Sequence, residues 1–302
     1  MERRELGRSG VVVSRLALGC GNFGGVGSAP AFFGEGISHQ EAFRIMDAAW
    51  DLGITTFDTA VHDALTIETK TFNPMGEGQD RGLAGARILR QVETSLRRLG
   101  IERIPLYTAH DFDPDVPQEE TVRAFDELVR AGKVGAVGAS NFSAQQLTEA
   151  LAISEREGLT RYEWVQNSFS LLDREEGEAV FGTCSEHGLG FEAFGPLAGG
   201  WLAGRYRRGE PYPDGSRMTQ RPDGYLRFAR DEVFDGLEAL EREAAGRSVS
   251  TAGLALAWLL ATPEVTVVVV GPTRAQHLEP VREALDLSLS PPERDSLRAL
   301  FA

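Results

Sequence analysis

The sequence of 302 residues contains only two cysteines and no long apolar run. Two thiols, Cys20 and Cys184, cannot form a disulfide framework or a cysteine-rich metal cluster, so we expect no bound metal. No apolar stretch approaches the roughly 20 residues that a membrane-spanning helix needs. The charged start, followed by only three valines, is unlike a secretory signal. We therefore expect a cytoplasmic protein without a membrane partner.

Lysine is scarce as well, because only Lys70 and Lys133 are lysines among 31 Lys and Arg residues. A lysine can lose its proton and an arginine cannot, so each lysine is a candidate for chemistry. The net charge of −14 would repel a polyanion, which argues against nucleic acid as a partner. The composition, 42% hydrophobic and 25% charged, is that of a globular protein and excludes a disordered or fibrous one.

Short apolar runs alternate with amphipathic stretches along the whole chain, which predicts an α/β fold. Because most of these runs are almost wholly apolar or end in a polar residue, they resemble parallel strands buried on both faces. Helices are predicted between most of them, and Ser38, Ser143 and Ser290 each begin a capping box. The eight expected strands span residues 15–19, 55–59, 65–68, 105–109, 136–138, 163–166, 190–194 and 265–270.

Eight strands with intervening helices predict a (β/α)8 TIM barrel, formed by residues 1–302 as a single domain. A β-hairpin over residues 5–14, turning around Gly10, precedes the first barrel strand. An open doubly wound sheet is the alternative. It would need a glycine fingerprint after an early strand, and the glycines of residues 19–24 match that fingerprint only in part.

One connection conflicts with the barrel, because only residues 61–64 join the second and third strands. Parallel neighbours normally need a crossover of about a dozen residues. Three explanations remain open. The recorded chain omits a segment; or the deletion is real and the barrel is opened or seven-stranded; or residues 65–70 are not a parallel strand.

Polar residues at the ends of the predicted strands define a candidate site, because these ends face the active site of such a barrel. Lys70 beside Asp58 would form a buried ion pair able to tune a neighbouring proton donor, and His110 could orient a carbonyl group. Ser140, Asn141 and Gln166 carry groups suited to a carboxamide, and Phe194 offers a face for stacking. Each residue alone has a structural interpretation as a cap, a core residue or a solvated side chain. Because all of these residues lie at the ends of predicted strands, the functional interpretation is favoured.

The sequence resembles the aldo-keto reductase superfamily, including its potassium-channel β-subunit branch, over nearly its whole length. The segments that carry the resemblance are residues 15–24 (RLALGCGNFG), 56–60 (TFDTA), 93–100 (ETSLRRLG), 128–135 (LVRAGKVG), 138–143 (GASNFS), 171–174 (LLDR) and 195–204 (GPLAGGWLAG). The resemblance implies a barrel that binds NADPH across its mouth and transfers a hydride to an aldehyde or ketone.

The resemblance also implies roles for individual residues. Asp58, Lys70 and His110 correspond to three members of a catalytic Asp-Tyr-Lys-His set, and Val281 stands where an adenine-contacting Asn is usual. The implied cofactor ligands are Gly21, Asn22, Ser140, Asn141 and Gln166 with the stacking Phe194, the pyrophosphate loop Gly195, Pro196, Leu197, Gly199, Leu202 and Arg205, and the 2′-phosphate segment Gly271, Thr273, Arg274 and His277.

The general-acid tyrosine of the family is missing, since position 63 is Asp and the next tyrosine is Tyr107. His62, on the shortened connection, is a candidate replacement, and His110 acting directly is another. Four aromatic residues are candidates for the pocket wall: Phe32, Phe33, Phe112 and Trp201. These observations predict an NADPH-dependent reductase of a small aldehyde or ketone, with activity impaired if nothing replaces the tyrosine. The alternatives are an NADPH-binding regulatory module with little turnover, and a redox-neutral isomerase or dehydratase that uses Lys70 and His110.

Overall fold

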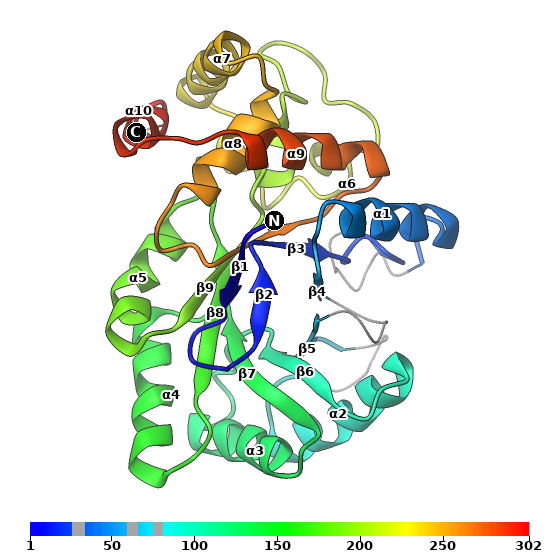
Figure 1. Cartoon of the computed structure of the whole chain (residues 1–302), viewed down its shortest axis with the longest axis vertical. Helices are drawn as coiled ribbons and strands as arrows, with labels where there is room; N and C mark the ends of the chain where they lie inside the picture. The colour runs from blue at the N-terminus through cyan, green and yellow to red at the C-terminus, as the bar shows by residue number, and fades with distance from the viewer. Residues whose placement is uncertain (26–33, 59–65, 75–80, 302) are drawn as a thin grey trace.

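The computed structural model describes residues 1–25, 34–58, 66–74 and 81–301. Eight parallel strands close into a barrel in the order β10-β3-β4-β5-β6-β7-β8-β9 (Figure 1). This confirms the predicted (β/α)8 architecture and excludes the open doubly wound sheet. The strands are β3 (Leu16–Gly19), β4 (Thr56–Asp58), β5 (Thr66–Thr71), β6 (Ile104–Ala109), β7 (Val134–Ser140), β8 (Tyr162–Ser168), β9 (Gly190–Phe194) and β10 (Val267–Val270).

The interior of the barrel is a packed core. Leu106, Trp164 and Val267 point inward and are fully buried. Trp164 from β8 lies so close to β7 that a Cβ atom on Gly138 would come within 2.1 Å of the indole ring. Glycine at position 138 therefore makes room for the largest side chain in the core.

An antiparallel hairpin, β1 (Arg3–Glu5) with β2 (Val12–Ser14), precedes the barrel and confirms the predicted one. Leu6 and Val13 are fully buried and join the cluster that contains Trp164. Figure 1 shows the hairpin in front of the barrel strands. The hairpin therefore covers one end of the barrel, which leaves the opposite, carboxyl-terminal end for a site.

Helices follow most strands and surround the barrel. They are α1 (His39–Asp51), α2 (Gly85–Leu99), α3 (Gln118–Arg130), α4 (Ala144–Glu157), α5 (Glu175–His187), η2 (Ala198–Ala203), α6 (Arg217–Gln220), η3 (Leu226–Phe228), α7 (Asp231–Gly246), α8 (Thr251–Leu260), η4 (Ala275–Leu278), α9 (Glu279–Asp286) and α10 (Pro291–Ala299). The capping boxes at Ser143 and Ser290 are present as predicted. Ser38 caps α1, but the Glu41 side chain contacts the amide of Ala275 and the guanidinium of Arg44.

Strands β4 and β5 pair in parallel, with Asp58 opposite Glu68. The expectation of an opened or seven-stranded barrel, or of a repaired third strand, is therefore wrong. The physical reason is the length of β4, which has only 3 residues. Thr66, the first residue of β5, pairs with Thr56 at the start of β4. The distance from Asp58 to Thr66 is therefore only two residues along a strand and one strand spacing across, about 8 Å, and needs no long crossover. The connection itself, residues 59–65, lies outside the described residues. The structure therefore does not test whether a segment is omitted there.

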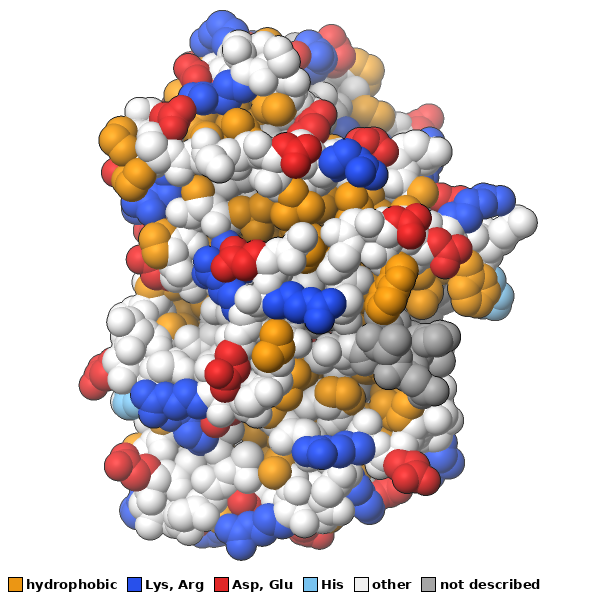
Figure 2. Space-filling view, viewed as in Figure 1, with side chains coloured by type: hydrophobic (Ala, Val, Ile, Leu, Met, Phe, Trp, Pro, Cys, Tyr) orange, Lys and Arg blue, Asp and Glu red, His pale blue; other side chains and the backbone are white. Residues whose placement is uncertain are grey.

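The surface of the described part of the chain mixes charges of both signs. On the face shown in Figure 2, acidic and basic side chains are interspersed. Two large apolar side chains, Phe43 and Trp50, are exposed on α1. They are seven residues apart and so lie along one stripe of the helix. None of the described helices is long and apolar enough to cross a membrane.

Candidate active site

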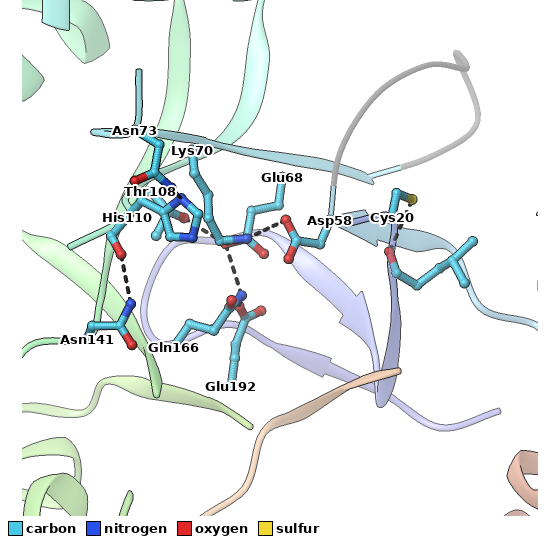
Figure 3. A network of polar contacts seen from close by, with 11 residues as sticks. Cys20, Asp58, Glu68, Lys70, Asn73, Thr108, His110, Asn141, Gln166 and Glu192 are labelled. Atoms are coloured by element: carbon cyan, nitrogen blue, oxygen red, sulfur yellow. Dashed lines mark hydrogen bonds and ion pairs between the residues drawn. The ribbon is translucent and has the colours of Figure 1, made fainter. Parts of the chain in front are cut away.

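The carboxyl-terminal ends of β4, β5 and β6 bring three predicted residues together. Asp58 is the last residue of β4, Lys70 lies near the end of β5, and His110 directly follows β6. Figure 3 shows their side chains converging on one small volume at the barrel mouth. Strand register explains this convergence, because Asp58 is level with Glu68 and Lys70 is level with Thr108.

Lys70 forms a nearly buried ion pair with Asp58, with Glu68 next to it. The Lys70 ammonium donates a short hydrogen bond to Asp58 Oδ1, and Glu68 Oε1 lies 3.9 Å from Nζ. Burial alone would lower the pKa of Lys70, but the charges of Asp58 and Glu68 outweigh it and raise the pKa overall. Lys70 is therefore held as a cation at neutral pH.

His110 is held neutral and in one tautomer. Burial lowers its pKa to about 4, and the Lys70 charge adds to this effect while Asp58 opposes it. Asn73 Nδ2 lies 3.0 Å from His110 Nδ1. With the Asn73 amide as donor, Nδ1 is the acceptor and the ring proton sits on Nε2. The imidazole can then donate one hydrogen bond from Nε2.

Backbone contacts fix the position of His110 between neighbouring strands. Its amide donates to Thr71 O at 2.8 Å, and its carbonyl accepts from Asn141 Nδ2 at 2.9 Å. Asn141 has φ of 60°, a left-handed conformation that Asn tolerates better than most residues. Because one N–H of its amide is engaged here, Asn141 could offer its Oδ1 atom and its second N–H to a cofactor carboxamide.

Gln166 is turned toward the interior of the barrel, below Lys70 (Figure 3). Its Nε2 donates to Glu192 Oε2 at 2.9 Å and lies 3.4 Å from Glu68 Oε1. With both N–H groups directed at these carboxylates, Gln166 has only its carbonyl oxygen left for a carboxamide. Ser140 ends β7, is level with Gln166, and is almost fully buried, while Phe194 ends β9 and is half-buried.

The loop after β9 carries the predicted pyrophosphate residues. Gly195, Gly199 and Gly200 all have positive φ, which glycine adopts freely. A Cβ atom on Gly199 would lie 2.5 Å from the ring of Tyr225. Glycine at position 199 therefore leaves room for the Tyr225 ring. The three glycines give the loop few side chains of its own, which suits it to bind a phosphate through its backbone amides. Pro196 and Leu202 are buried, so neither side chain is available to a ligand there.

Arginines gather beside this loop. Burial and the charges of Arg221 and Arg205 lower the pKa of Arg217, although Tyr225 and Tyr206 oppose them. Burial, then Arg274 and Arg205, also lower the pKa of His277. The arginine cluster therefore comprises Arg205, Arg217, Arg221 and Arg274. Cations that lie close together are suited to bind an anion such as a phosphate, and Arg217 is the one of these four that is partly buried.

Two further predicted segments adjoin the arginine cluster. Asn22, just after β3, donates to Gly271 O at 3.0 Å and accepts from Arg217 at 2.8 Å. Thr273 Oγ1 lies 3.2 Å from His277 Nδ1. An open cleft of about 680 Å³ lies next to them, lined by Ile37, Ser38, Glu41, Arg44, Thr273, Arg274, Ala275 and Gln276. The glycine loop, the cations and this cleft together fit a dinucleotide that carries phosphates.

Some predicted residues do not join the site. Trp201 is fully buried against Tyr206, Phe228 and Phe234, so its prediction as a pocket wall is wrong. It fills the core because the segment after η2 folds back over it. Phe112 is half-buried and packs edge-on against Phe142. Val281 packs in the core, and Phe32, Phe33 and His62 lie outside the described residues.

Several polar residues of the site were not predicted. Asn73, Thr108, Glu192 and Arg217 contact predicted residues or their partners, and Glu68 was noticed only as a strand end. Glu192 had a usable signal, since it is the one charged residue in an otherwise apolar strand, Gly190–Phe194. Arg217 had none, because the chain is rich in arginine and α6 is only 4 residues long.

Comparison with known proteins gives consistent matches. The sequence model of the Aldo/keto reductase family matches residues 61–301. An uncharacterized oxidoreductase of Bacillus subtilis, YrpG, is 33% identical over 99% of this chain and 95% of its own. A probable voltage-gated potassium channel subunit beta of rice is 30% identical over 99% and 96%. The L-glyceraldehyde 3-phosphate reductase of Escherichia coli K12 is 31% identical over 95% and 88%.

One alignment is longer than this chain. The alignment with the Bacillus subtilis protein has 333 positions, whereas the present chain has 302 residues. The relative therefore has residues without a counterpart in this chain.

Proposed function

The chain belongs to the Aldo/keto reductase family, and from this premise we propose that it reduces the carbonyl group of a small aldehyde or ketone, with NADPH as the reductant. One observation carries the proposal: Asp58, Lys70 and His110 meet at the open end of the barrel. The relatives named as oxidoreductases support the same class of reaction.

The residues of the site have distinct tasks in such a reduction. A reduced nicotinamide supplies the hydride when it is bound. The Nε2–H group of His110 donates a hydrogen bond to the substrate oxygen and so holds the carbonyl in place. The Lys70 cation stabilises the negative charge that develops on that oxygen, and Asp58 keeps Lys70 in position. Burial strengthens both effects, because water screens them little.

The arginine cluster favours NADPH over NADH. A 2′-phosphate adds a dianion at the adenosine end of the cofactor, and Arg274 lines the cleft there. Arg205 is near enough to lower the pKa of His277, so its charge reaches the same region. Glu41 opposes this preference, but its carboxylate is engaged by Arg44 and by the amide of Ala275.

The residue that donates the proton in this reaction is not identified by the family's residue pattern. No tyrosine lies near Asp58 in the sequence, and loss of a general acid costs on the order of 10²–10⁴ in rate. His62 stays a candidate. Its test is a His62→Ala variant in a carbonyl-reduction assay with NADPH, and an unchanged kcat would remove His62 from the mechanism.

A second candidate function is a cofactor-binding module that turns over little or not at all. The similarity to potassium-channel β subunits favours it, as does the missing tyrosine. A redox-neutral isomerase or dehydratase would use Lys70 and His110 without any cofactor. We assign the protein to the cytoplasm, where the free and buried thiols of Cys20 and Cys184 would stay reduced.

One experiment separates these functions. The protein is titrated with NADPH and then given a panel of small aldehydes and ketones, while the loss of NADPH absorbance is followed. We expect tight binding and carbonyl-dependent oxidation. Binding without oxidation would indicate the module. Absence of binding would contradict both the reductase and the module and leave the redox-neutral enzyme.

A further inference from the structure

Two glutamates that the proposed mechanism does not use lie inside the barrel, below Lys70. Glu68 comes from β5 and Glu192 from β9, two strands that face each other across the closed barrel. Both side chains are fully buried. Figure 3 shows them on either side of Gln166, with the Lys70 ammonium above. We call Glu68 and Glu192 the carboxyl pair.

The hydrogen bonds of the carboxyl pair are incomplete. Thr108 Oγ1 donates to Glu68 Oε1 at 2.7 Å, and Gln166 Nε2 donates to Glu192 Oε2 at 2.9 Å. Within the described part of the chain, no donor reaches the remaining oxygens, Glu68 Oε2 and Glu192 Oε1. A buried carboxylate oxygen without a donor is costly. One proton on the pair would supply the missing donor, because a protonated carboxyl can donate to the other carboxylate.

The local charge balance requires such a proton. Asp58, Glu68 and Glu192 are three carboxyl groups, and Lys70 is the cation next to them. His110 is neutral, and burial keeps the nearby Cys20 thiol neutral by raising its pKa. Full ionisation would therefore leave a net charge of −2 on this largely buried group, which is unfavourable.

The pKa values of Glu68 and Glu192 also indicate that the carboxyl pair holds a proton. Burial raises the pKa of Glu192 well above its ordinary value, and the charge of Glu68 raises it further. Burial also raises the pKa of Glu68, against the opposing charge of Lys70. Glu68 lies next to the Lys70 cation, which favours its carboxylate form, so the shared proton lies preferentially on Glu192.

We propose that Glu68 and Glu192 share one proton, and that this carboxyl pair is the store that returns a proton to Lys70 during carbonyl reduction. The proposal rests on the proposed function. It answers the question that the missing tyrosine leaves, since Lys70 can act as the proton donor only if another group restores its proton.

The proton transfers balance in three steps. As the carbonyl carbon accepts the hydride, an N–H bond of Lys70 breaks and an O–H bond forms on the substrate oxygen. The neutral Lys70 amine then takes a proton through Glu68, as the O–H bond of Glu192 breaks. Solvent returns one proton to the pair after the product leaves. The 3.9 Å from Lys70 Nζ to Glu68 Oε1 means that Lys70 must move about 1 Å from Asp58 toward Glu68 to make this contact.

Infrared spectroscopy of the protein without cofactor tests the shared proton. We expect the carbonyl stretching band of a protonated carboxylic acid at neutral pH, and its loss in Glu192→Gln. Glu163→Gln is the control, because Glu163 is a barrel glutamate on β8 that is only partly buried and is paired with Arg161 and with the amide of Arg8. If Glu192→Gln fails to fold, a Glu68→Gln/Glu192→Gln double variant with two neutral amides takes its place. A spectrum without the band, or a band that survives in the variants, overturns the proposal.

Kinetics test the transfer to Lys70. In Glu192→Gln we expect kcat to fall about 10²-fold and the solvent deuterium isotope effect on kcat to rise, because proton return becomes the slow step. NADPH affinity should be unchanged, and Glu163→Gln should behave as the unaltered protein does. An unchanged kcat in Glu192→Gln would show that the carboxyl pair does not return protons to Lys70 and has only a structural role. If the unaltered protein oxidises no NADPH, the proposed function fails, whereas the infrared band still decides whether the proton is shared.

Discussion

The two sides of the barrel mouth differ in charge and in how closely they follow the family pattern. The side formed by the loops after β9 and β10 holds four arginines and a glycine loop. The side formed by β4, β5 and β6 holds Asp58, Lys70 and His110 over the carboxyl pair. The first suits the binding of phosphates, and the second suits the transfer of protons.

The two sides also differ in how many groups each proposed task depends on. The phosphate side depends on backbone and on charges spread over several residues, so the loss of one contact weakens it only in part. The proton side depends on single groups in contact, and the family's tyrosine is absent from it. Removing one group should therefore have a large effect on the proton side and a small one on the phosphate side.

The largest effect is expected at Lys70. Replacement by methionine removes the cation that the substrate oxygen needs, and kcat should fall by about 10²–10⁴. Lys70→Arg keeps the charge but cannot release a proton, and it should lose turnover as well. The control is Lys133→Met, since Lys133 is the other lysine and pairs with Glu93 on the surface. Substantial turnover in Lys70→Arg would show that the proton comes from elsewhere.

The second prediction concerns His110 and pH. Burial lowers its pKa to about 4 in the folded protein, against about 6.5 in an unfolded chain. Between pH 4 and pH 6.5, the unfolded chain therefore binds more protons at His110 than the folded protein does. The contribution of neutral His110 to the free energy of unfolding is complete above pH 6.5 and is lost as pH falls toward 4.

Urea unfolding at pH 6.5 and at pH 5 measures this contribution. From pH 6.5 to pH 5, the free energy of unfolding should fall by about 2 kcal/mol more in the unaltered protein than in a His110→Gln variant. His39→Gln, at an exposed histidine on α1, is the control and should follow the unaltered protein. Equal losses in His110→Gln and in the unaltered protein would mean that His110 is not held neutral.

The smallest effect is expected on the phosphate side. Arg274→Met should raise the Kd for NADPH about 10-fold, because one charge-assisted hydrogen bond to the 2′-phosphate is lost. The Kd for NADH should stay nearly the same. Arg208→Met serves as the control, since Arg208 pairs with Asp231 and Asp235 away from the mouth. A parallel loss of NADH affinity would place Arg274 at a different part of the cofactor.

The sequence predicted the barrel because its strands carry a local signal. Most are short apolar runs, and several end in a polar residue, as in Thr56–Asp58 and Tyr162–Ser168, whereas Thr66–Thr71 is largely polar. Asp58, Lys70 and His110 were identified for the same reason, since strand ends share one rim. The predicted barrel implied that β4 and β5 pair in parallel, but the short connection left that pairing open, because the rule for crossover length does not allow for a strand of only 3 residues.

Contacts across the barrel could not be predicted. Glu192 lies near Glu68 only because β9 faces β5, and no local pattern in either strand shows this. Asn73 reaches His110 after Phe72, which has the unusual φ of 147°, and no motif predicts that turn. Trp201 looked like a pocket residue because its burial depends on Tyr206 and Phe228, later in the chain.

The most direct test of the account is isotope transfer. The protein is incubated with a small aldehyde and NADPH that carries deuterium at nicotinamide C4 in the transferred position, and the alcohol is analysed by mass spectrometry. We expect one deuterium on the carbinol carbon with the unaltered protein, and at least about 10²-fold less labelled alcohol in the same time with Lys70→Met. Unlabelled aldehyde recovered from a protein saturated with NADPH would contradict the account.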